Sequence, residues 1–248
     1  MKDVKRGIPG EKERTLFQNE ACLVINKLPG EDSEFLPETA AENKFPVPVH
    51  RLDTPVSGCL LLAKTPEAAA FLGAAFLQPA AGNEAERNRI KKYYWAVVEM
   101  PQEELPAEGE LVNWLYENKE KNKTFAEPWE EGNAPRKGSC APPKKAVLRY
   151  QVIGKGERYL FLGIDLVTGR HHQIRAQLAA RGLHIKGDLK YGSRRSEKGG
   201  GIRLHAYSLA FPNPLNPSET IRVSAEPPLK DALWIACLNA EFGKRNSE

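Results

Sequence analysis

A short polar segment, His50-Arg51-Leu52-Asp53-Thr54, precedes the apolar run Cys59–Ala63. A loop held by a rigid strand is well placed for catalysis, because the strand limits how far the loop can move. The guanidinium of Arg51 favours the ionised form of the nearby Asp53 carboxylate, as a nucleophile or a base requires. The same residues also fit a surface Arg–Asp pair with His50 as partly buried filler, and residue chemistry alone does not separate these alternatives.

A second polar segment runs from Thr168 to Arg175. We expect a helix over residues 171–181, with Thr168 or a neighbour as its N-cap and Gly182 just beyond its end. The N–H groups and dipole at a helix start favour a phosphate or a carboxylate. Arg175 follows one turn after His171, on the same expected face. This segment could bind an RNA phosphate or pair with an active-site aspartate, and a solvated basic helix is the alternative.

Metal and cofactor chemistry find little support in the sequence. No HExxH pattern, phosphate-binding GxxxxGK[ST] loop or GxGxxG motif is present, and the four cysteines are widely separated. Adjacent histidines on a helix project in different directions, which argues against a metal site built from His171, His172, His184 and His205. The sequence motifs therefore give no sign of a bound metal or nucleotide cofactor.

Several segments have the patterns of the elements that would position these residues. Strands are predicted by apolar, β-branched or aromatic runs at 21–26, 59–63, 93–98, 146–153 and 158–166, the last two joined by a turn at 154–156. A helix is predicted over 66–77, with Thr65 as its N-cap. Neighbours in a strand point to opposite faces, so one of Tyr93 and Tyr94 should face a core and the other a cleft. Many strands and few helices indicate a mixed, mostly antiparallel α+β domain.

The composition is that of an ordinary globular protein. The 248 residues carry a net charge of +4, no apolar run approaches the length of a membrane span, and the polar N-terminus has no signal-peptide pattern. The cytoplasm is the expected location. A mildly basic chain suits a polyanionic partner. Basic residues crowd one stretch, namely Arg170, Arg175, Arg181, Lys186, Lys190, Arg194, Arg195, Lys198 and Arg203.

Taken together, these segments resemble the RluA family of pseudouridine synthases. Five blocks in one order carry the resemblance: His50–Asp53 with Ser57-Gly58 and Leu60–Lys64; Lys92–Ala96; Thr168–Arg170 with His172–Arg175; Gly187-Asp188 with Tyr191-Gly192; and Arg203–Leu209 with Phe211 and Pro214. Asn26–Gly30 is a looser match to the opening motif of that family. Several matched blocks in the right order form a specific signal.

The resemblance implies a mixed, mostly antiparallel α+β catalytic domain with flanking helices and a central RNA cleft. It implies isomerisation of specific uridines to pseudouridine in structured RNA, rRNA or tRNA, with no cofactor and no obligatory protein partner. Asp53 aligns with the nucleophile, Tyr94 with the tyrosine that stacks on the target base, and Arg175 with the cation that pairs with the aspartate. The motif residues aligned with RNA or pocket contacts are Arg51, His50, Leu52, Arg170, His172, Gln173 and Leu204.

Some positions depart from the family pattern. His171 replaces a small hydroxyl residue and Val56 replaces a threonine, and neither change removes a group expected to be catalytic. We expect an N-terminal extension at 1–20, a catalytic domain at 21–242 with a hydrophilic insertion at about 117–145, and a tail at 243–248. Two rival functions remain: a non-catalytic RNA-binding protein on the same fold, and a glycosidic-bond hydrolase, for which Asp188 would be the second acid.

Overall fold

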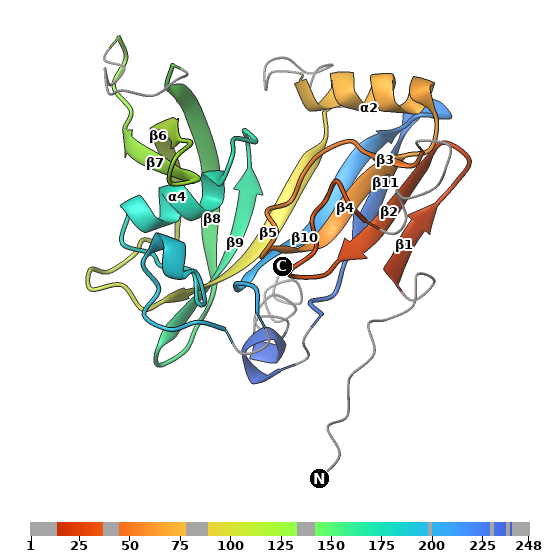
Figure 1. The fold of residues 1–248 in the computed structure, drawn as a ribbon. Coiled ribbons are helices and arrows are strands. Elements are labelled where there is room, and N and C mark those ends of the chain that lie inside the picture. The colour runs from red at the N-terminus through yellow and green to blue at the C-terminus, as the bar shows by residue number, and fades with distance from the viewer. Residues whose placement is uncertain are drawn as a thin grey trace.

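The computed structural model describes residues 14–36, 45–77, 89–132, 142–197, 200–228, 231–236 and 239. Within these ranges one 11-stranded sheet runs across the molecule (Figure 1). Its strands are β1 (Thr15–Gln18), β2 (Cys22–Lys27), β3 (Val47–Pro48), β4 (Ser57–Ala63), β5 (Lys91–Glu99), β6 (Glu108–Asn118), β7 (Lys123–Pro128), β8 (Lys144–Lys155), β9 (Tyr159–Leu166), β10 (Leu204–Asn213) and β11 (Asn216–Ser224).

The main path of the sheet has the order β1-β2-β4-β10-β5-β9-β8-β6-β7, with β11 paired to β10 and β3 to β4. Every pair among these strands is antiparallel except β4 with β10, which is parallel. This arrangement confirms the expected mixed, mostly antiparallel α+β fold. Strand β4 is buried along its whole length because it lies in the interior of the sheet and both of its faces are covered.

Two helices bear out the helical predictions in part. Helix α2 (Pro66–Leu77) has the expected bounds, and Thr65 caps it by accepting a hydrogen bond from the Ala68 amide at 3.2 Å. Helix α4 (Gln173–Ala180) begins two residues later than predicted, and Gly182 follows it with a φ of +78°. The prediction that Thr168 caps this helix was wrong. His172 occupies the N-cap position without a capping side-chain hydrogen bond, and the Thr168 hydroxyl donates to the Gln173 side chain at 2.8 Å.

The two faces of strand β5 explain how the tyrosines are divided. Tyr94, Ala96 and Val98 belong to the largest buried cluster, which also includes Ile174 and Leu178 of α4. Tyr93 packs against a separate cluster, with Trp95 and Val97. The alternation of a strand therefore places Tyr94 on the face of the sheet that α4 covers. The predicted strands at 146–153 and 158–166 pair as β8 and β9, with the turn at 156–158 rather than 154–156.

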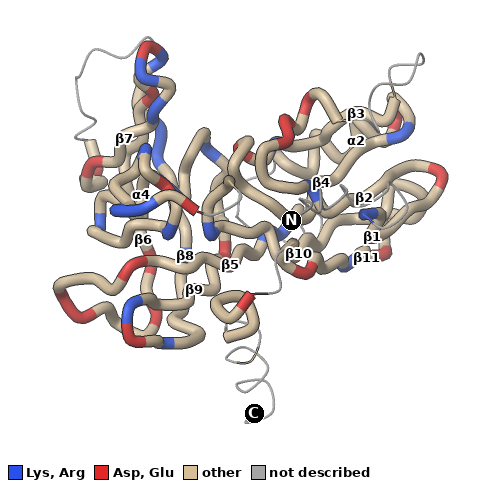
Figure 2. The backbone as a smooth tube through the Cα atoms, turned by 60° about the horizontal axis from the view of Figure 1, so that its bottom comes forward, with Lys and Arg blue, Asp and Glu red and all other residues tan. Residues whose placement is uncertain are grey.

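Two segments that we expected to lie outside the core of the domain, the extension 1–20 and the insertion 117–145, contribute strands to this sheet. Strand β1 lies within the expected extension 1–20 and pairs with β2. The described part of 117–145 holds the end of β6, all of β7 and the start of β8, so its ribbon is an extension of the sheet. The expected tail at 243–248 lies outside the described residues. Figure 2 shows basic residues along the β6–β7 hairpin and near α4. None of the described helices is long and apolar enough to cross a membrane.

Candidate active site

A buried lysine anchors the loop that carries Asp53. Lys27 is fully buried, and its Nζ donates to the carbonyl oxygens of Leu28 at 3.0 Å, Glu31 at 2.9 Å and Thr54 at 3.3 Å. Burial lowers the pKa of Lys27 to about 8, against the opposing charges of Glu31 and Asp53. The ammonium group thus ties the end of β2 to the residue that follows Asp53.

A second anchor acts on the residue before Asp53. The hydroxyl of Ser33 accepts a hydrogen bond from the Leu52 amide at 3.1 Å and lies 3.0 Å from the Leu52 carbonyl, to which it donates. Ser33 and Leu52 are both buried. After Asp53 the chain closes a turn, with the Val56 amide donating to the Asp53 carbonyl at 2.9 Å. The backbone on both sides of Asp53 is therefore held before any ligand binds.

Arg175 of α4 connects two carboxylates. Its Nη1 donates to Oδ2 of Asp53 at 3.0 Å, while Nε and Nη2 donate to the two oxygens of Asp188 at 2.7 and 2.8 Å. Burial acts to lower the pKa of Arg175, but the hydrogen bonds and charges of Asp188 and Asp53 outweigh it and raise that pKa. Both oxygens of Asp188 are occupied, so Asp188 does not serve as the second acid that a glycosidic-bond hydrolase would need.

His172 lies beside the same aspartate. Its Nε2 is 3.7 Å from Oδ2 of Asp53, and its Nδ1 is 3.0 Å from the hydroxyl oxygen of Tyr191. That oxygen also accepts a hydrogen bond from the backbone amide of Thr124 at 2.9 Å. The imidazole of His171 stacks on that of His172, with ring centroids 3.8 Å apart. The β6–β7 hairpin, through Thr124, thus supports the residues around Asp53.

Tyr94 and Leu204 lie together in the buried cluster on this face of the sheet. Both are nearly inaccessible to solvent, and Leu204 pairs with Ala96 in the ladder between β10 and β5. Burial raises the pKa of Tyr94 well above its usual range, and the negative charge of Asp53 adds to the rise. The tyrosine is therefore a neutral phenol near the aspartate. Of the Asp53 side chain, 22% remains exposed.

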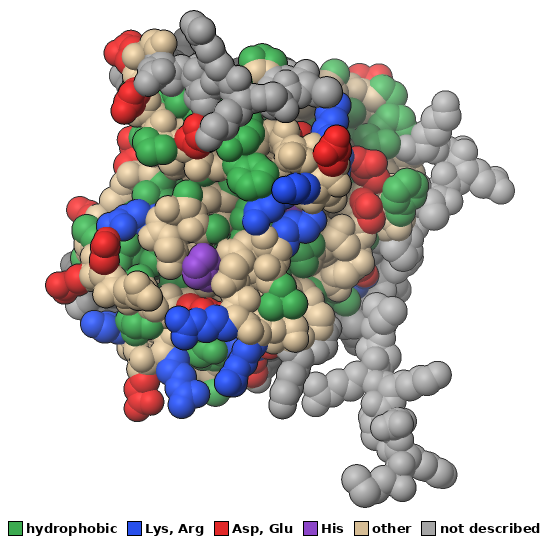
Figure 3. Space-filling view, turned by 60° about the vertical axis from the view of Figure 1, so that its left-hand side comes forward, with side chains coloured by type: hydrophobic (Ala, Val, Ile, Leu, Met, Phe, Trp, Pro, Cys, Tyr) green, Lys and Arg blue, Asp and Glu red, His purple; other side chains and the backbone are tan. Residues whose placement is uncertain are grey.

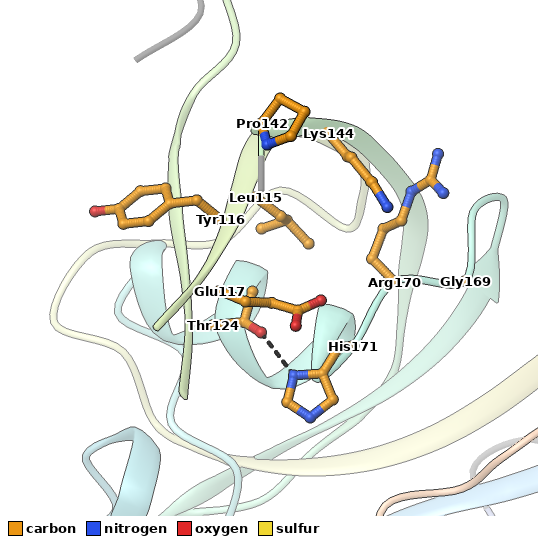
Figure 4. A pocket seen from close by; sticks show the side chains of 9 residues that line it. All are labelled: Leu115, Tyr116, Glu117, Thr124, Pro142, Lys144, Gly169, Arg170 and His171. Atoms are coloured by element: carbon orange, nitrogen blue, oxygen red, sulfur yellow. Dashed lines mark hydrogen bonds between the residues drawn. The ribbon is translucent and has the colours of Figure 1, made fainter. Parts of the chain in front are cut away.

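The two arginines that the sequence associated with RNA are both exposed. Arg51 forms a surface ion pair with Glu34 at 2.9 Å. Arg170 lines a cavity of about 160 Å³ at the start of α4, together with Lys144 and His171. Figure 4 shows Lys144 and Arg170 side by side at this cavity, with the His171 ring bonded to Thr124 below them. On the face that carries β6, β7 and α4, basic side chains gather in two groups (Figure 3).

His50 and Gln173 make internal hydrogen bonds. Nε2 of His50 accepts from the Leu61 amide at 3.1 Å, and burial lowers the pKa of His50 to about 3. The Gln173 amide group donates to the Val147 carbonyl and to Gln177, and its oxygen accepts from Arg170. These bonds attach the loop that carries Asp53 to β4 and the start of α4 to β8. Whether either residue also contacts RNA stays a prediction.

The remaining histidines have other surroundings. His205 is fully buried between Ser57 at 2.8 Å and the Ala225 carbonyl at 2.9 Å, and His184 lies 2.8 Å from the Tyr191 carbonyl. In the part of the chain that the structure describes, no three His, Cys, Asp or Glu side chains gather as a metal site would require.

Several residues that hold the site were not predicted from the sequence. Three of them lie in matched motifs and could have been found: Lys27 in the looser opening motif, and Asp188 and Tyr191 in the fourth matched block. Ser33 and Thr124 lie in segments without any motif. Their contacts depend on chain segments that meet only in the folded protein.

The fold is the one found in pseudouridylate synthase domains. The human RNA Pseudouridylate Synthase Domain Containing 1 superposes with a TM-score of 0.67 over 93% of this chain and 90% of that protein, at 23% identity. The human RNA Pseudouridylate Synthase Domain Containing 4 gives a TM-score of 0.65 over 93% of this chain and 94% of its own, at 20% identity. At these identities the likeness concerns the fold.

The sequence then identifies the family. The profile of the RNA pseudouridylate synthase family matches residues 22–180, and the chain belongs to that family, in its RluA group. An uncharacterized RNA pseudouridine synthase of Zymomonas mobilis is 29% identical, over 89% of this chain and 95% of its own. The tRNA pseudouridine synthase C of Haemophilus ducreyi is 28% identical, over 92% and 95% of the two chains. This chain is therefore an enzyme of the pseudouridine synthase type, an isomerase that acts on RNA.

Proposed function

We propose that this enzyme isomerises specific uridines in structured tRNA or rRNA with Asp53 as its nucleophile. The contact of 3.0 Å between Arg175 and Asp53 carries this proposal. A buried guanidinium stabilises the ionised carboxylate, while 22% of the Asp53 side chain stays accessible to a substrate. Asp188 fixes the orientation of that guanidinium through two further hydrogen bonds.

The reaction requires the glycosidic C–N bond to break, the base to rotate and a C–C bond to form at C5 of the uracil, which then loses its hydrogen. Asp53 could attack the sugar, remove a sugar proton to give a glycal, or add to C6 of the base. Each route needs an ionised carboxylate, and the positive charge of Arg175 stabilises that ionised form. The raised pKa of Tyr94 keeps its hydroxyl protonated, so it can donate a hydrogen bond to the base.

A target uridine inside folded RNA must first leave its stack, at a cost of about a few kcal/mol. We assign the compensating contacts to three residues. Arg51, which is exposed beside the catalytic loop, enters the vacated space. Tyr94 stacks on the extruded base, and Leu204 forms the apolar wall of the pocket, because both belong to one buried cluster.

The same proposal extends to the RNA path and the organisation of the chain. Arg170 and Lys144, at the cavity next to His171, contact the RNA backbone, and His172 and Leu52 complete the central cleft. We assign 21–242 as the catalytic domain. The relatives include a tRNA pseudouridine synthase C and a Ribosomal large subunit pseudouridine synthase C, the latter of Vibrio parahaemolyticus and 26% identical over 81% of this chain and 62% of its own. Both RNA classes are therefore candidate substrates.

The test is tritium release from RNA that carries 5-tritiated uridine, with total RNA from a source strain that lacks the enzyme. The wild-type protein should release tritium, because C5 loses its hydrogen when it becomes the glycosidic carbon. Asp53→Asn should release none while it binds RNA nearly as well, and Asp165→Asn, which changes an exposed aspartate on β9, should behave like the wild type. Turnover by Asp53→Asn would exclude the nucleophile, and no release by folded wild-type protein would favour a non-catalytic RNA-binding role.

A further inference from the structure

Two hydrogen-bond donors converge on one oxygen of Asp53. Nη1 of Arg175 lies 3.0 Å and Nε2 of His172 lies 3.7 Å from Oδ2. No hydrogen bond to Oδ1 is found among the described residues, whereas Oδ2 accepts one from Arg175. The two oxygens of the carboxylate are therefore not equivalent. One is held by the protein, and the other is left to meet the substrate.

The backbone at His172 gives a second, independent observation. His172 has a φ of +49°, in the left-handed region, and is one of two described non-glycine residues with a positive φ. Such backbone is strained for an L residue and persists where the surrounding structure enforces it, often at functional sites. The side chain makes no capping hydrogen bond to α4, so capping does not account for this conformation.

The partners of the two ring nitrogens favour one tautomer of His172. The Thr124 amide can only donate, so the Tyr191 oxygen accepts from it at 2.9 Å. The hydroxyl of Tyr191 also has a hydrogen to donate, and Nδ1 of His172 lies 3.0 Å away. When Nδ1 accepts that hydrogen, a neutral imidazole has its own hydrogen on Nε2, which faces the Asp53 carboxylate, a group that can only accept.

We propose that His172 is a positioning residue for Asp53, whose neutral Nε2–H, oriented by Tyr191 and Thr124, holds Oδ2 and leaves Oδ1 as the reacting oxygen. This inference rests on the proposed function of Asp53. The distance of 3.7 Å shortens to a hydrogen bond when the substrate closes the site, as catalytic contacts often do. A neutral donor orients the carboxylate without adding a second positive charge, so Asp53 keeps its reactivity.

The charges around His172 agree with a neutral ring. Burial lowers its pKa to about 4, Asp53 opposes this, and the positive charges of Arg175, His171 and Lys190 add to the lowering. Tyr191, the remaining titratable neighbour, has its own pKa raised to about 12 by burial and so retains its hydroxyl hydrogen. At neutral pH the imidazole of His172 therefore carries one N–H, and the hydrogen bond from Tyr191 to Nδ1 favours its location on Nε2.

The direct test is the ¹⁵N NMR spectrum of the histidines in the full-length wild-type protein at pH 7, with His172→Asn used to assign the signals of His172. We expect its Nε2 to be protonated and its Nδ1 not to be. Protonation on Nδ1 would overturn the proposal. This measurement needs no RNA, so its outcome is independent of whether Asp53 is the nucleophile.

Kinetics provide a second test with matched variants. The amide nitrogen of glutamine can replace Nε2, whereas asparagine tolerates the left-handed backbone but reaches only the position of Nδ1. His172→Gln should therefore retain more of the wild-type kcat than His172→Asn, which should lose about tenfold or more in kcat with a smaller change in KM for RNA. Equal losses in the two variants, or a loss confined to KM, would contradict a positioning role.

Tyr191→Phe gives a signature in the ¹⁵N spectrum. It keeps the ring that lies against Arg175 but removes the donor to Nδ1, so His172 can adopt the other tautomer. The share of His172 with its hydrogen on Nδ1 should rise in this variant, and kcat should fall with it. An unchanged tautomer together with an unchanged kcat would indicate that Tyr191 has only a structural role.

Discussion

The Nη1 atom of Arg175 lies 3.0 Å from Oδ2 of Asp53, although the two residues are 122 positions apart in the chain. Its two other hydrogen bonds are with Asp188, whose side chain is 1% exposed. One buried arginine thus stabilises the buried carboxylate of Asp188 and orients that of Asp53, the proposed nucleophile. The two effects can be separated by mutation.

Arg175→Met should lower the free energy of unfolding by about 3–5 kcal/mol, because it leaves the Asp188 carboxylate buried without a partner. Urea unfolding at pH 7 measures this loss. In the double variant Arg175→Met/Asp188→Asn the buried charge is gone, and much of the stability should return. Activity should stay lost in both variants, since Asp53 lacks its cation. Recovery of turnover in the double variant would show that Arg175 acts only through stability.

Lys27→Met should lower kcat and stability, although Lys27 itself makes no contact with the substrate in the proposed mechanism. The Thr54 and Leu28 carbonyls still accept from the Gly30 and Glu31 amides, whereas the Glu31 carbonyl loses its donor, which costs about 1–3 kcal/mol of stability. The loop around Asp53 loosens, so kcat should fall by about 100-fold if the carboxylate is displaced by ~1 Å. Tritium release and urea unfolding measure the two effects. Lys91→Met, at an exposed position on β5, should change neither.

Stability should depend on pH through buried histidines. The folded-state pKa of His205 is lowered by burial to about 4, below the unfolded value of about 6.5. Between these values the unfolded chain binds the extra proton, so stability is complete above pH 6.5 and falls as the pH drops toward 4. From pH 6.5 to 5, His205 alone should account for a loss of about 2 kcal/mol.

Urea unfolding at pH 7 and pH 5 measures this dependence. His50 and His172 have lowered pKa values as well and contribute in the same direction. His205→Gln should show a smaller loss between the two pH values than the wild type. A loss of the same size in this variant would mean that His205 is not the group that titrates.

Binding of RNA should depend on salt through the exposed cations that follow Asp188. The Arg194 side chain is 83% exposed and lies 3.8 Å from Glu99, whereas the Lys186 side chain is 19% exposed and forms an ion pair with Glu197. Arg194→Gln should therefore reduce the slope of log K against log salt by about 1, and Lys186→Gln should change it less. Fluorescence anisotropy with labelled RNA at several salt concentrations measures the slopes. Identical slopes for Arg194→Gln and wild type would place the RNA elsewhere.

Local patterns in the sequence predicted much of the fold. Strands β2, β4, β5, β8 and β9 and helix α2 follow from apolar runs and caps, because these signals lie within each element. The first residues of α4 were misassigned, since the Thr168 hydroxyl bonds to Gln173 and to the β8 backbone in place of capping the helix. Strand β1 was missed because its four residues form a strand only by pairing with β2.

By itself the sequence determined the family and the residue types at the site, because Asp53, Tyr94 and Arg175 each lie in a matched block. Only the tertiary structure decided how they are held. It buried Lys27 beneath the catalytic loop, gave Arg175 a second carboxylate, and joined Thr124, Tyr191 and His172 in one network. The physical reason is that a hydrogen bond depends on distance and direction between groups, and residues far apart in the chain acquire both only when the sheet and α4 pack together.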